Sequence, residues 1–109
     1  MDFNIKRYNF NEDGKKLVSV EEKGKNWPVV YLLHSDKEIY VGETQNLYKR
    51  IEQHLKNRAS SSLKTMEIIF DDEFNKSAIL DIEQSLIQLL SADKKYKLQN
   101  QNGGQSEKT

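Results

Sequence analysis

The sequence predicts an α/β (α+β) fold with a small three-stranded, mainly antiparallel sheet flanked by helices. Residues 29–33 form a continuous apolar run rich in β-branched side chains, which is typical of a buried strand. Further along, apolar residues recur at every fourth position at Leu47, Ile51 and Leu55, which is the spacing of an amphipathic helix. A chain of 109 residues is long enough to enclose one hydrophobic core between such elements.

The central pair of strands is predicted to be a hairpin. Polar turn-forming residues occupy positions 34–38, and residues 39–42 are expected to return antiparallel to the first strand and to stop at Gly42. Thr44 is a suitable N-cap for the helix that follows from Gln45, because its hydroxyl can accept a hydrogen bond from a free N–H group of the first turn. Residues 57–62 include three consecutive serines and are expected to form a flexible connection.

A third strand and a last helix complete the predicted core. Residues 64–70 place Met66, Ile68 and Phe70 on one face, as a half-buried strand does. Either Asn75 or Ser77 is expected to cap the last helix. The core stripe of that helix is predicted at Ile79, Ile82, Leu86, Leu89 and Leu90.

The chain is predicted to contain one domain with two flanking segments. Residues 1–26 are expected to be an N-terminal extension packed on the domain or leading into it, with an edge strand at residues 3–6 and a helix that begins at residues 11–13. The domain itself is assigned to residues 27–102 and ends in a short extended stretch from residue 96. Residues 103–109 have the composition of a disordered tail or a truncated linker.

The composition excludes several classes of protein. The absence of cysteine excludes disulfides and thiolate metal sites. The longest apolar run is far too short to span a bilayer, and the N-terminus lacks the pattern of a signal peptide. We therefore expect a cytoplasmic protein that does not interact with membranes.

Charge is balanced overall but unevenly distributed along the chain. The 17 basic and 17 acidic residues give a formal net charge of zero, which argues against binding nucleic acid by charge alone. Residues 45–64 nevertheless carry five bases and one acid, with Lys49, Lys56 and Arg58 among the bases, whereas residues 67–83 carry six acids and one base. The basic segment could bind phosphate groups and the acidic one a metal ion, or both could be ordinary solvated surface.

Four side chains suited to phosphodiester chemistry occur close together in the sequence. Tyr31 and Tyr40 lie in the two strands of the hairpin. Arg50 and His54 are four positions apart, so they project from the same side of the following helix, at the edge of its apolar stripe. The alternative is an ordinary structural role for each, because tyrosines are common in strands and exposed Arg and His are common on helices.

Glu83 is the candidate metal ligand. It lies in the apolar stripe of the last helix, between Ile82 and Leu86. Burial of a carboxylate is costly unless the group is paired or bound to a cation, so a partly buried Glu83 favours a ligand role. The alternative is an exposed glutamate on the helix surface.

Together these residues resemble the motifs of the GIY-YIG nuclease domain. Val29-Val30-Tyr31 is similar to the first motif of that family, and Tyr40-Val41-Gly42, nine positions later, is similar to the second. The glycine and isoleucine of the first motif are both valine here, and the stretch between the helix glutamate and the closing asparagine is longer than usual. The resemblance covers roughly residues 27–102. The matching positions, in chain order, are Tyr31, Tyr40, Arg50, His54, Glu83 and Asn100, with Asn102 as the rival of Asn100.

The resemblance implies a metal-dependent endonuclease module that hydrolyses phosphodiester bonds in DNA. Glu83 would hold one divalent cation, Mg²⁺ or Mn²⁺. Tyr31 would act as general base on the attacking water, helped by His54. Arg50 would bind the scissile phosphate with its planar guanidinium.

The resemblance also implies supporting roles and a wider context. Tyr40 would orient the phosphate or the water, and Asn100 would hold the loop of the glutamate in place. Lys49, Lys56 and Arg58 are the candidate substrate-binding residues. The motifs are also similar to a nuclease-like domain that precedes an ATPase/helicase-type region in some larger bacterial proteins, so such a domain is an expected partner in the same chain. The alternative is a catalytically silent domain of this fold that binds nucleic acid or a partner protein.

Overall fold

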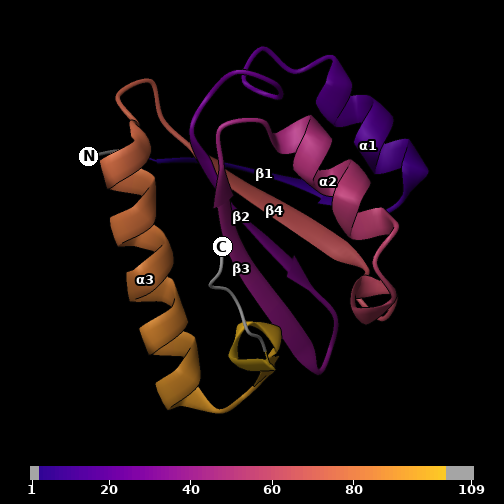
Figure 1. Cartoon of the computed structure of the whole chain (residues 1–109), viewed down its shortest axis with the longest axis vertical. Helices are drawn as coiled ribbons and strands as arrows, with labels where there is room; N and C mark the ends of the chain where they lie inside the picture. Colours follow the sequence, from indigo (N-terminus) through magenta and orange to yellow (C-terminus); the bar gives the residue numbers. More distant parts are fainter. Residues whose placement is uncertain (1–2, 103–109) are drawn as a thin grey trace.

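The computed structural model describes residues 3–102, which form one sheet with helices on both faces (Figure 1). Its strands are β1 (Asn4–Asn9), β2 (Val29–His34), β3 (Glu38–Thr44), β4 (Thr65–Phe70) and β5 (Lys97–Leu98). Its helices are α1 (Glu12–Ser19), α2 (Leu47–Leu55) and α3 (Lys76–Asp93), with short 3₁₀-helices η1 (Arg58–Ser60) and η2 (Gln99–Asn102). α1 and α2 contact each other over one face of the sheet, and α3 lies over the other.

The sheet is mixed and mostly antiparallel, with the strand order β1-β4-β2-β3-β5. β1 pairs with β4 along its whole length, whereas β5 runs parallel to only the first two residues of β3. The predicted α+β class is confirmed, but the predicted three strands are too few, since the described residues contain five. Five of the six residues of β1 are exposed and β5 has two residues, so neither shows the apolar pattern of a buried strand.

Side chains of the central strands alternate between two cores. Tyr31 points to the face covered by α1 and α2, where it lies in one cluster with Leu47 and Ile51 of α2. Val30 points to the opposite face and lies in a second cluster with Ile79 of α3. This alternation is the period of two that a strand imposes, and it leaves Tyr31 with 0% of its surface exposed.

Asparagine side chains cap the N-termini of the three described α-helices. Asn11, Asn46 and Asn75 each accept a hydrogen bond from the backbone N–H three residues later. Asn75 therefore caps α3, so of the two residues expected for this cap, Asn75 is confirmed and Ser77 is not. The prediction that Thr44 caps α2 is wrong, because its hydroxyl accepts a hydrogen bond from the backbone N–H of Asn46 at 3.0 Å and shapes the turn before the helix.

The second half of β3 lies at the edge of the sheet. β5 pairs only with Glu38 and Ile39. Asn100 covers the next part of the edge, since its side-chain amide donates to the carbonyl of Val41 at 2.6 Å and accepts from the N–H of Val41 at 2.9 Å. No described strand pairs with this edge at residues 42–44, which lie between α2 on one face and α3 on the other (Figure 1).

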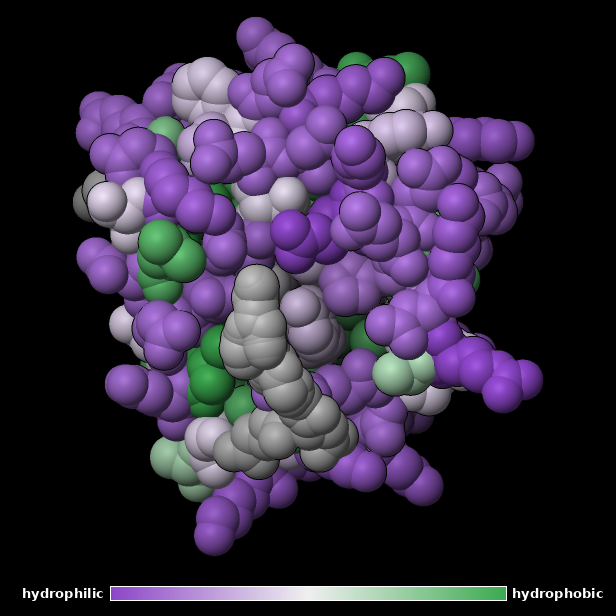
Figure 2. Space-filling model, viewed as in Figure 1, coloured by the Kyte–Doolittle hydropathy of each residue, from purple (hydrophilic) through white to green (hydrophobic). Residues whose placement is uncertain are grey.

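The face of the molecule seen in Figure 2 is largely hydrophilic. In the view of Figure 2, hydrophilic residues cover most of the elements and hydrophobic ones appear in small separate areas. Within residues 3–102, no helix has the length and apolar character needed to cross a membrane. The N-terminal extension adds β1 and α1 to the sheet and its cover, and the expected tail at residues 103–109 lies outside the described residues.

Candidate active site

Tyr31 is positioned by the absence of a side chain at Gly42. The two residues face each other across β2 and β3. A Cβ atom placed on Gly42 would lie only 2.7 Å from Cε1 of Tyr31, so the phenol ring occupies the space that a side chain would need. The ring is fully buried, and its hydroxyl reaches His54 on α2.

Three rings meet between the hairpin and α2. The ring centroids of Tyr31 and Tyr40 are 6.1 Å apart. The imidazole of His54 lies 5.6 Å from Tyr31 and 4.8 Å from Tyr40, and it meets both rings edge-on. Such pairs are worth about 0.5–1.5 kcal/mol each beyond the area they bury. The packing therefore holds two phenols and one imidazole in fixed mutual orientation.

His54 is a neutral imidazole in this cluster. Burial, together with the positive charge of Arg50, lowers the pKa of His54 to about 4. Its Nε2 lies 2.8 Å from the hydroxyl oxygen of Tyr31, and its Nδ1 lies 3.4 Å from Oγ of the buried Ser60 in η1. In the tautomer that carries the ring proton on Nδ1, facing Ser60, Nε2 can accept a hydrogen bond from Tyr31.

Arg50 lies one helical turn before His54 and faces the same phenols. Burial opposes its charge, but the Tyr31 and Tyr40 phenols and the nearby carboxylate of Glu43 raise the pKa of Arg50, which remains a cation. Burial also raises the pKa of Tyr31 well above its ordinary value; Tyr40 adds to this effect, and Arg50 opposes it. Tyr31 is therefore a protonated phenol that needs its neighbours in order to lose a proton.

Two glutamates lie on the other side of this cluster, where α3 passes the edge of β3. Glu43 directly follows Gly42; its side chain is 17% exposed, and Nζ of Lys76 lies 2.6 Å from its Oε1. Glu83 is half-buried on α3, and burial and then the charge of Glu43 raise its pKa. The charges of Lys76 and Arg50 act on it in the opposite direction. The two carboxylates thus interact with each other within the field of the same two cations.

The carboxylate of Glu83 fits the ligand of a hard divalent cation. Among the described side chains, none forms a hydrogen bond or an ion pair with it, although it is half-buried. A carboxylate in that position is costly until a cation binds to it. Mg²⁺ in particular accepts few protein oxygens, because it keeps several of its waters. No group of three or more acidic or histidine side chains within residues 3–102 could hold a metal ion, so a site here would depend on Glu83 with Glu43 beside it.

A cavity opens beside the ring cluster. Tyr40 and His54 line it on one side, and η1 with the serines that follow lines it on the other. Arg58, one of the three expected substrate-binding residues, lies on its wall. Lys49 and Lys56 are exposed and do not line it, so the structure does not bring them to this opening.

Asn100 fixes the strand that carries the site. Its amide binds both backbone polar groups of Val41, the residue that follows Tyr40. The sequence led us to expect that it would hold the loop of the glutamate, whereas these hydrogen bonds hold β3. The rival position, Asn102, lies in η2.

Three residues of this arrangement were not expected from the sequence. Glu43 and Lys76 are separated by 33 positions, and only the crossing of α3 at the edge of β3 brings them together. Ser60 belongs to the serine run that was expected to be flexible, but it forms η1 and lies against His54. An acidic residue directly after the second motif was the one local signal available for Glu43.

Comparison with known proteins identifies one family. The family model of the GIY-YIG catalytic domain matches residues 26–97. No curated protein and no solved structure matches the chain at a significant level. The matched segment contains Tyr31, Tyr40, Arg50, His54 and Glu83 and ends before Asn100.

Proposed function

Because the chain belongs to the GIY-YIG catalytic-domain family, we propose that it is a metal-dependent endonuclease module that hydrolyses phosphodiester bonds in DNA. The family itself implies nuclease-type hydrolysis of a phosphodiester; DNA as substrate and the requirement for a cation belong to the proposal. One observation supports it best. The hydroxyl of Tyr31 lies 2.8 Å from Nε2 of a neutral His54, which is a ready path for a proton.

In the proposed reaction, Tyr31 takes a proton from the attacking water while it passes its own proton to His54. A phenol is a weak base at neutral pH, and burial makes Tyr31 harder still to ionise, so transfer to the imidazole is a necessary part of the step. The charge of Arg50 is one of the two causes that lower the pKa of His54. A phosphate bound to Arg50 would offset that charge and make His54 a better acceptor when substrate is present.

Arg50 and Tyr40 are the proposed contacts to the scissile phosphate. The guanidinium of Arg50 carries donors in a planar fork that matches two phosphate oxygens. It lies next to the phenols and near the glutamates, so a phosphate held there would lie between the base and the acidic pair. Tyr40, packed edge-on against His54, would orient the phosphate or the water.

Glu83 is the proposed ligand of one Mg²⁺ or Mn²⁺ ion, with Glu43 as its neighbour. When bound, such an ion stabilises negative charge on the phosphate and on the leaving oxygen. Glu43 and Lys76 already form an ion pair at this position. The charge of Lys76 therefore reduces the repulsion between the two carboxylates in the absence of substrate.

The proposal extends to the organisation of the chain. We assign the catalytic unit to residues 27–102, residues 1–26 to an extension that supports it through β1 and α1, and residues 103–109 to a tail or linker. An ATPase/helicase-type domain in the same polypeptide is proposed from the similarity of the motifs alone, and the comparisons add no support for it.

Cleavage of supercoiled plasmid with Mg²⁺ or Mn²⁺ tests the proposed function. The intact chain should nick the DNA, EDTA should stop the reaction, and Glu83→Gln should abolish it. Asp81→Asn is the matched control, because it neutralises an exposed carboxylate on the same helix and should leave cleavage unchanged. If both variants lose activity equally, surface charge and not the metal ligand is responsible.

The competing function is a catalytically silent domain that binds nucleic acid or a protein. It predicts that the intact chain and Glu83→Gln bind DNA with the same affinity and that neither cuts it with either cation. Cleavage by the intact chain that depends on Glu83 would exclude it.

A further inference from the structure

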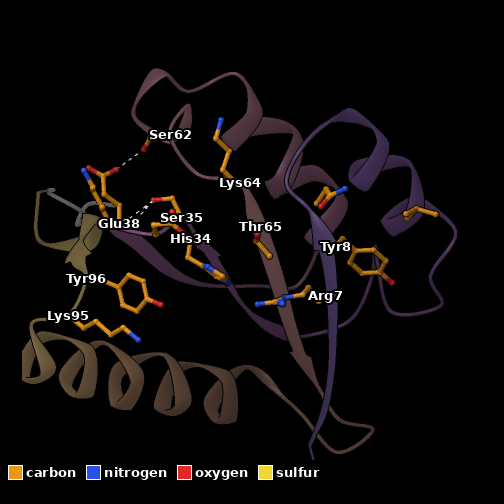
Figure 3. A pocket seen from close by; sticks show the side chains of 14 residues that line it. Arg7, Tyr8, His34, Ser35, Glu38, Ser62, Lys64, Thr65, Lys95 and Tyr96 are labelled. Carbon is orange, nitrogen blue, oxygen red and sulfur yellow. Dashed lines mark hydrogen bonds between the residues drawn. The ribbon is translucent and has the colours of Figure 1, made fainter.

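A larger depression lies outside the ring cluster, at the end of the sheet. It has a volume of about 1140 Å³ and extends from the end of β1, across the end of β2 and the start of β4, to the segment after α3 (Figure 3). This surface, termed the basic groove, has more bases than acids on its walls. Its cations are Arg7, Lys37, Lys64 and Lys95, and its acids are Asp36 and Glu38.

Three of these cations are available to bind an anion. Lys37, Lys64 and Lys95 form no ion pair with a described residue, whereas Arg7 lies 3.2 Å from Oε2 of Glu67. Solvated ammonium groups of this kind gain free energy at a nucleic acid, because each phosphate contact releases condensed counterions. The volume also exceeds that of an ordinary small-molecule site, which favours a polymer as the occupant.

Aromatic rings accompany the charges. Tyr8 of β1 and Tyr96 after α3 lie near opposite ends of the basic groove in Figure 3, with His34 between them. Nζ of Lys95 lies 5.5 Å from the ring centroid of Tyr96, so the two side chains form a cation–π pair. Proteins that bind single-stranded nucleic acid combine these two features, since the charges follow the backbone and unpaired bases stack on the rings.

The basic groove is continuous with the cavity of the candidate active site. Glu38 and Ser62 line both depressions. Ser62 donates a hydrogen bond to the Glu38 carboxylate at 2.7 Å, and Gln99 donates to the same oxygen at 2.8 Å. Lys97, on the wall of the cavity, lies close enough for its charge to offset that of Glu38. Glu38, the acid at this junction, is therefore held by two hydrogen-bond donors and has Lys97 nearby.

The path between the two depressions turns round the end of the sheet. Tyr40 packs on the face covered by α1 and α2. His34 follows the alternation of Leu32 on β2, so it points to the face of α3, where it and Arg7 both contact Glu67. The whole domain measures 33 × 30 × 26 Å. A duplex with a persistence length of about 150 bp cannot follow such a turn, but a single strand can.

We propose that the basic groove binds a single-stranded segment of nucleic acid that is continuous with the strand held in the active site. The position of that strand rests on the proposed nuclease function. The inference narrows the substrate to a nucleic acid with a single-stranded flank beside the cleavage point. Lys37, Lys64 and Lys95 contact its phosphates, and Tyr96 stacks on its bases.

Binding measured without cleavage tests this inference. Fluorescence anisotropy of the intact chain in EDTA would compare a blunt hairpin duplex with the same hairpin carrying a single-stranded overhang of about 12 nucleotides, a length within the site sizes of single-strand binders. DNA and RNA overhangs would be compared, because both have phosphates and stacking bases. Lys37→Glu/Lys95→Glu is the test variant. Lys16→Glu/Lys25→Glu, which makes the same charge change at two exposed lysines outside the basic groove, is the control.

The test variant should bind the overhang substrate about tenfold more weakly, with little change for the blunt hairpin. The slope of log affinity against log salt should become shallower by about 1.4 for the two lost phosphate contacts. Equal weakening for both substrates, or equal weakening in the control variant, would overturn the inference. So would displacement of the overhang by polyglutamate of the same length and charge.

The inference and the proposed function can fail separately. If the chain binds overhangs through these lysines but does not cut plasmid with either cation, binding by the basic groove is supported and the proposed nuclease function is refuted. If the chain cuts plasmid in a Glu83-dependent manner but has no preference for an overhang, the proposed role of the basic groove is refuted and the nuclease function is supported.

Discussion

The ring of Tyr31 fills the space above Gly42 that any other residue at that position would need for its side chain. The two residues are paired across the hairpin, and a Cβ on Gly42 would come within 2.7 Å of Cε1 of the phenol. The glycine therefore sets the depth at which the phenol lies. That depth fixes the 2.8 Å contact between its hydroxyl and His54. Gly42 belongs to the candidate active site although it carries no functional group.

Gly42→Ala should impair cleavage much more than folding. The added methyl group must push the Tyr31 ring away, and a displacement of about 1 Å at a catalytic group costs about 100-fold in rate. Overpacking of this kind lowers the free energy of unfolding by about 1–3 kcal/mol, which leaves most small domains folded. Nicking rates and thermal unfolding measured on the same protein would check both parts.

Tyr31→Phe provides the control for this prediction. It removes the hydroxyl, so the double variant Tyr31→Phe/Gly42→Ala should cut no more slowly than Tyr31→Phe alone. If the two losses of rate were additive, Gly42 would act through something other than the phenol.

Stability should decrease as the pH falls from about 6.5 to about 4, because His54 is largely buried in its neutral form. Burial and the charge of Arg50 lower the pKa of His54 from 6.5 to about 4 in the folded chain. The unfolded chain therefore binds a proton in this range that the native state does not, and the stabilisation present above pH 6.5 is lost as the pH falls through 4. The full difference amounts to about 3 kcal/mol.

Urea unfolding at a series of pH values between 4 and 8 would measure this dependence. In His54→Gln the free energy of unfolding should vary little with pH over that range. In His34→Gln, which leaves His54 in place, most of the pH dependence should remain. A wild-type stability that does not change between pH 6.5 and 4 would contradict the burial of a neutral imidazole.

The central hairpin could be predicted from the sequence, and an edge strand was expected at residues 3–6, but the sequence did not show which strands these edges would join. β2 is buried on both faces, so its first five residues form an unbroken apolar run that identifies it directly. β1 is exposed along most of its length and β5 pairs through two residues, so both depend on partners far away in the chain. A polar segment carries no local information about which strand it will join.

The same distinction applies to the candidate site. Tyr31, Tyr40, Arg50 and His54 lie in one hairpin and the next helix, so their proximity was expected from the sequence, whereas a shared role rested on the family resemblance. The pair of Glu43 with Lys76 depends on where α3 crosses the sheet, which no local pattern determines. The buried environment that makes His54 neutral is likewise a result of tertiary packing.

Glu43→Gln should weaken the binding of a cation next to Glu83, and Lys76→Met should strengthen it. Glu43 adds negative charge beside Glu83, while Lys76 adds positive charge to the same region. Removing the acid therefore reduces the attraction for a cation, and removing the lysine increases it. Titration with Tb³⁺, with luminescence sensitised by the nearby tyrosines, would report affinity without any cleavage, and each change should be several-fold.

Asp81→Asn serves as the control in this titration, because Asp81 is an exposed acid of α3 and should not alter Tb³⁺ affinity. Weaker Tb³⁺ binding in Lys76→Met would contradict this prediction. It would mean that Lys76 holds Glu43 in position for the cation and that the charge of Lys76 does not compete with the cation.

Asn100→Asp should destabilise the chain by about 1–3 kcal/mol, because it leaves the carbonyl of Val41 without its side-chain donor and opposite a carboxylate. In a domain of this size the unfolding temperature should fall by about 4–8 °C for each kcal/mol. Asn57→Asp is the matched control, since the side chain of Asn57 only accepts a hydrogen bond, from the N–H of Ala59, and aspartate can still do so. Thermal unfolding of both variants, with hydrogen exchange at the Val41 amide, would measure the difference. An equal effect in the two variants would mean that the donor bond from Asn100 to Val41 contributes nothing to the stability of the β3 edge.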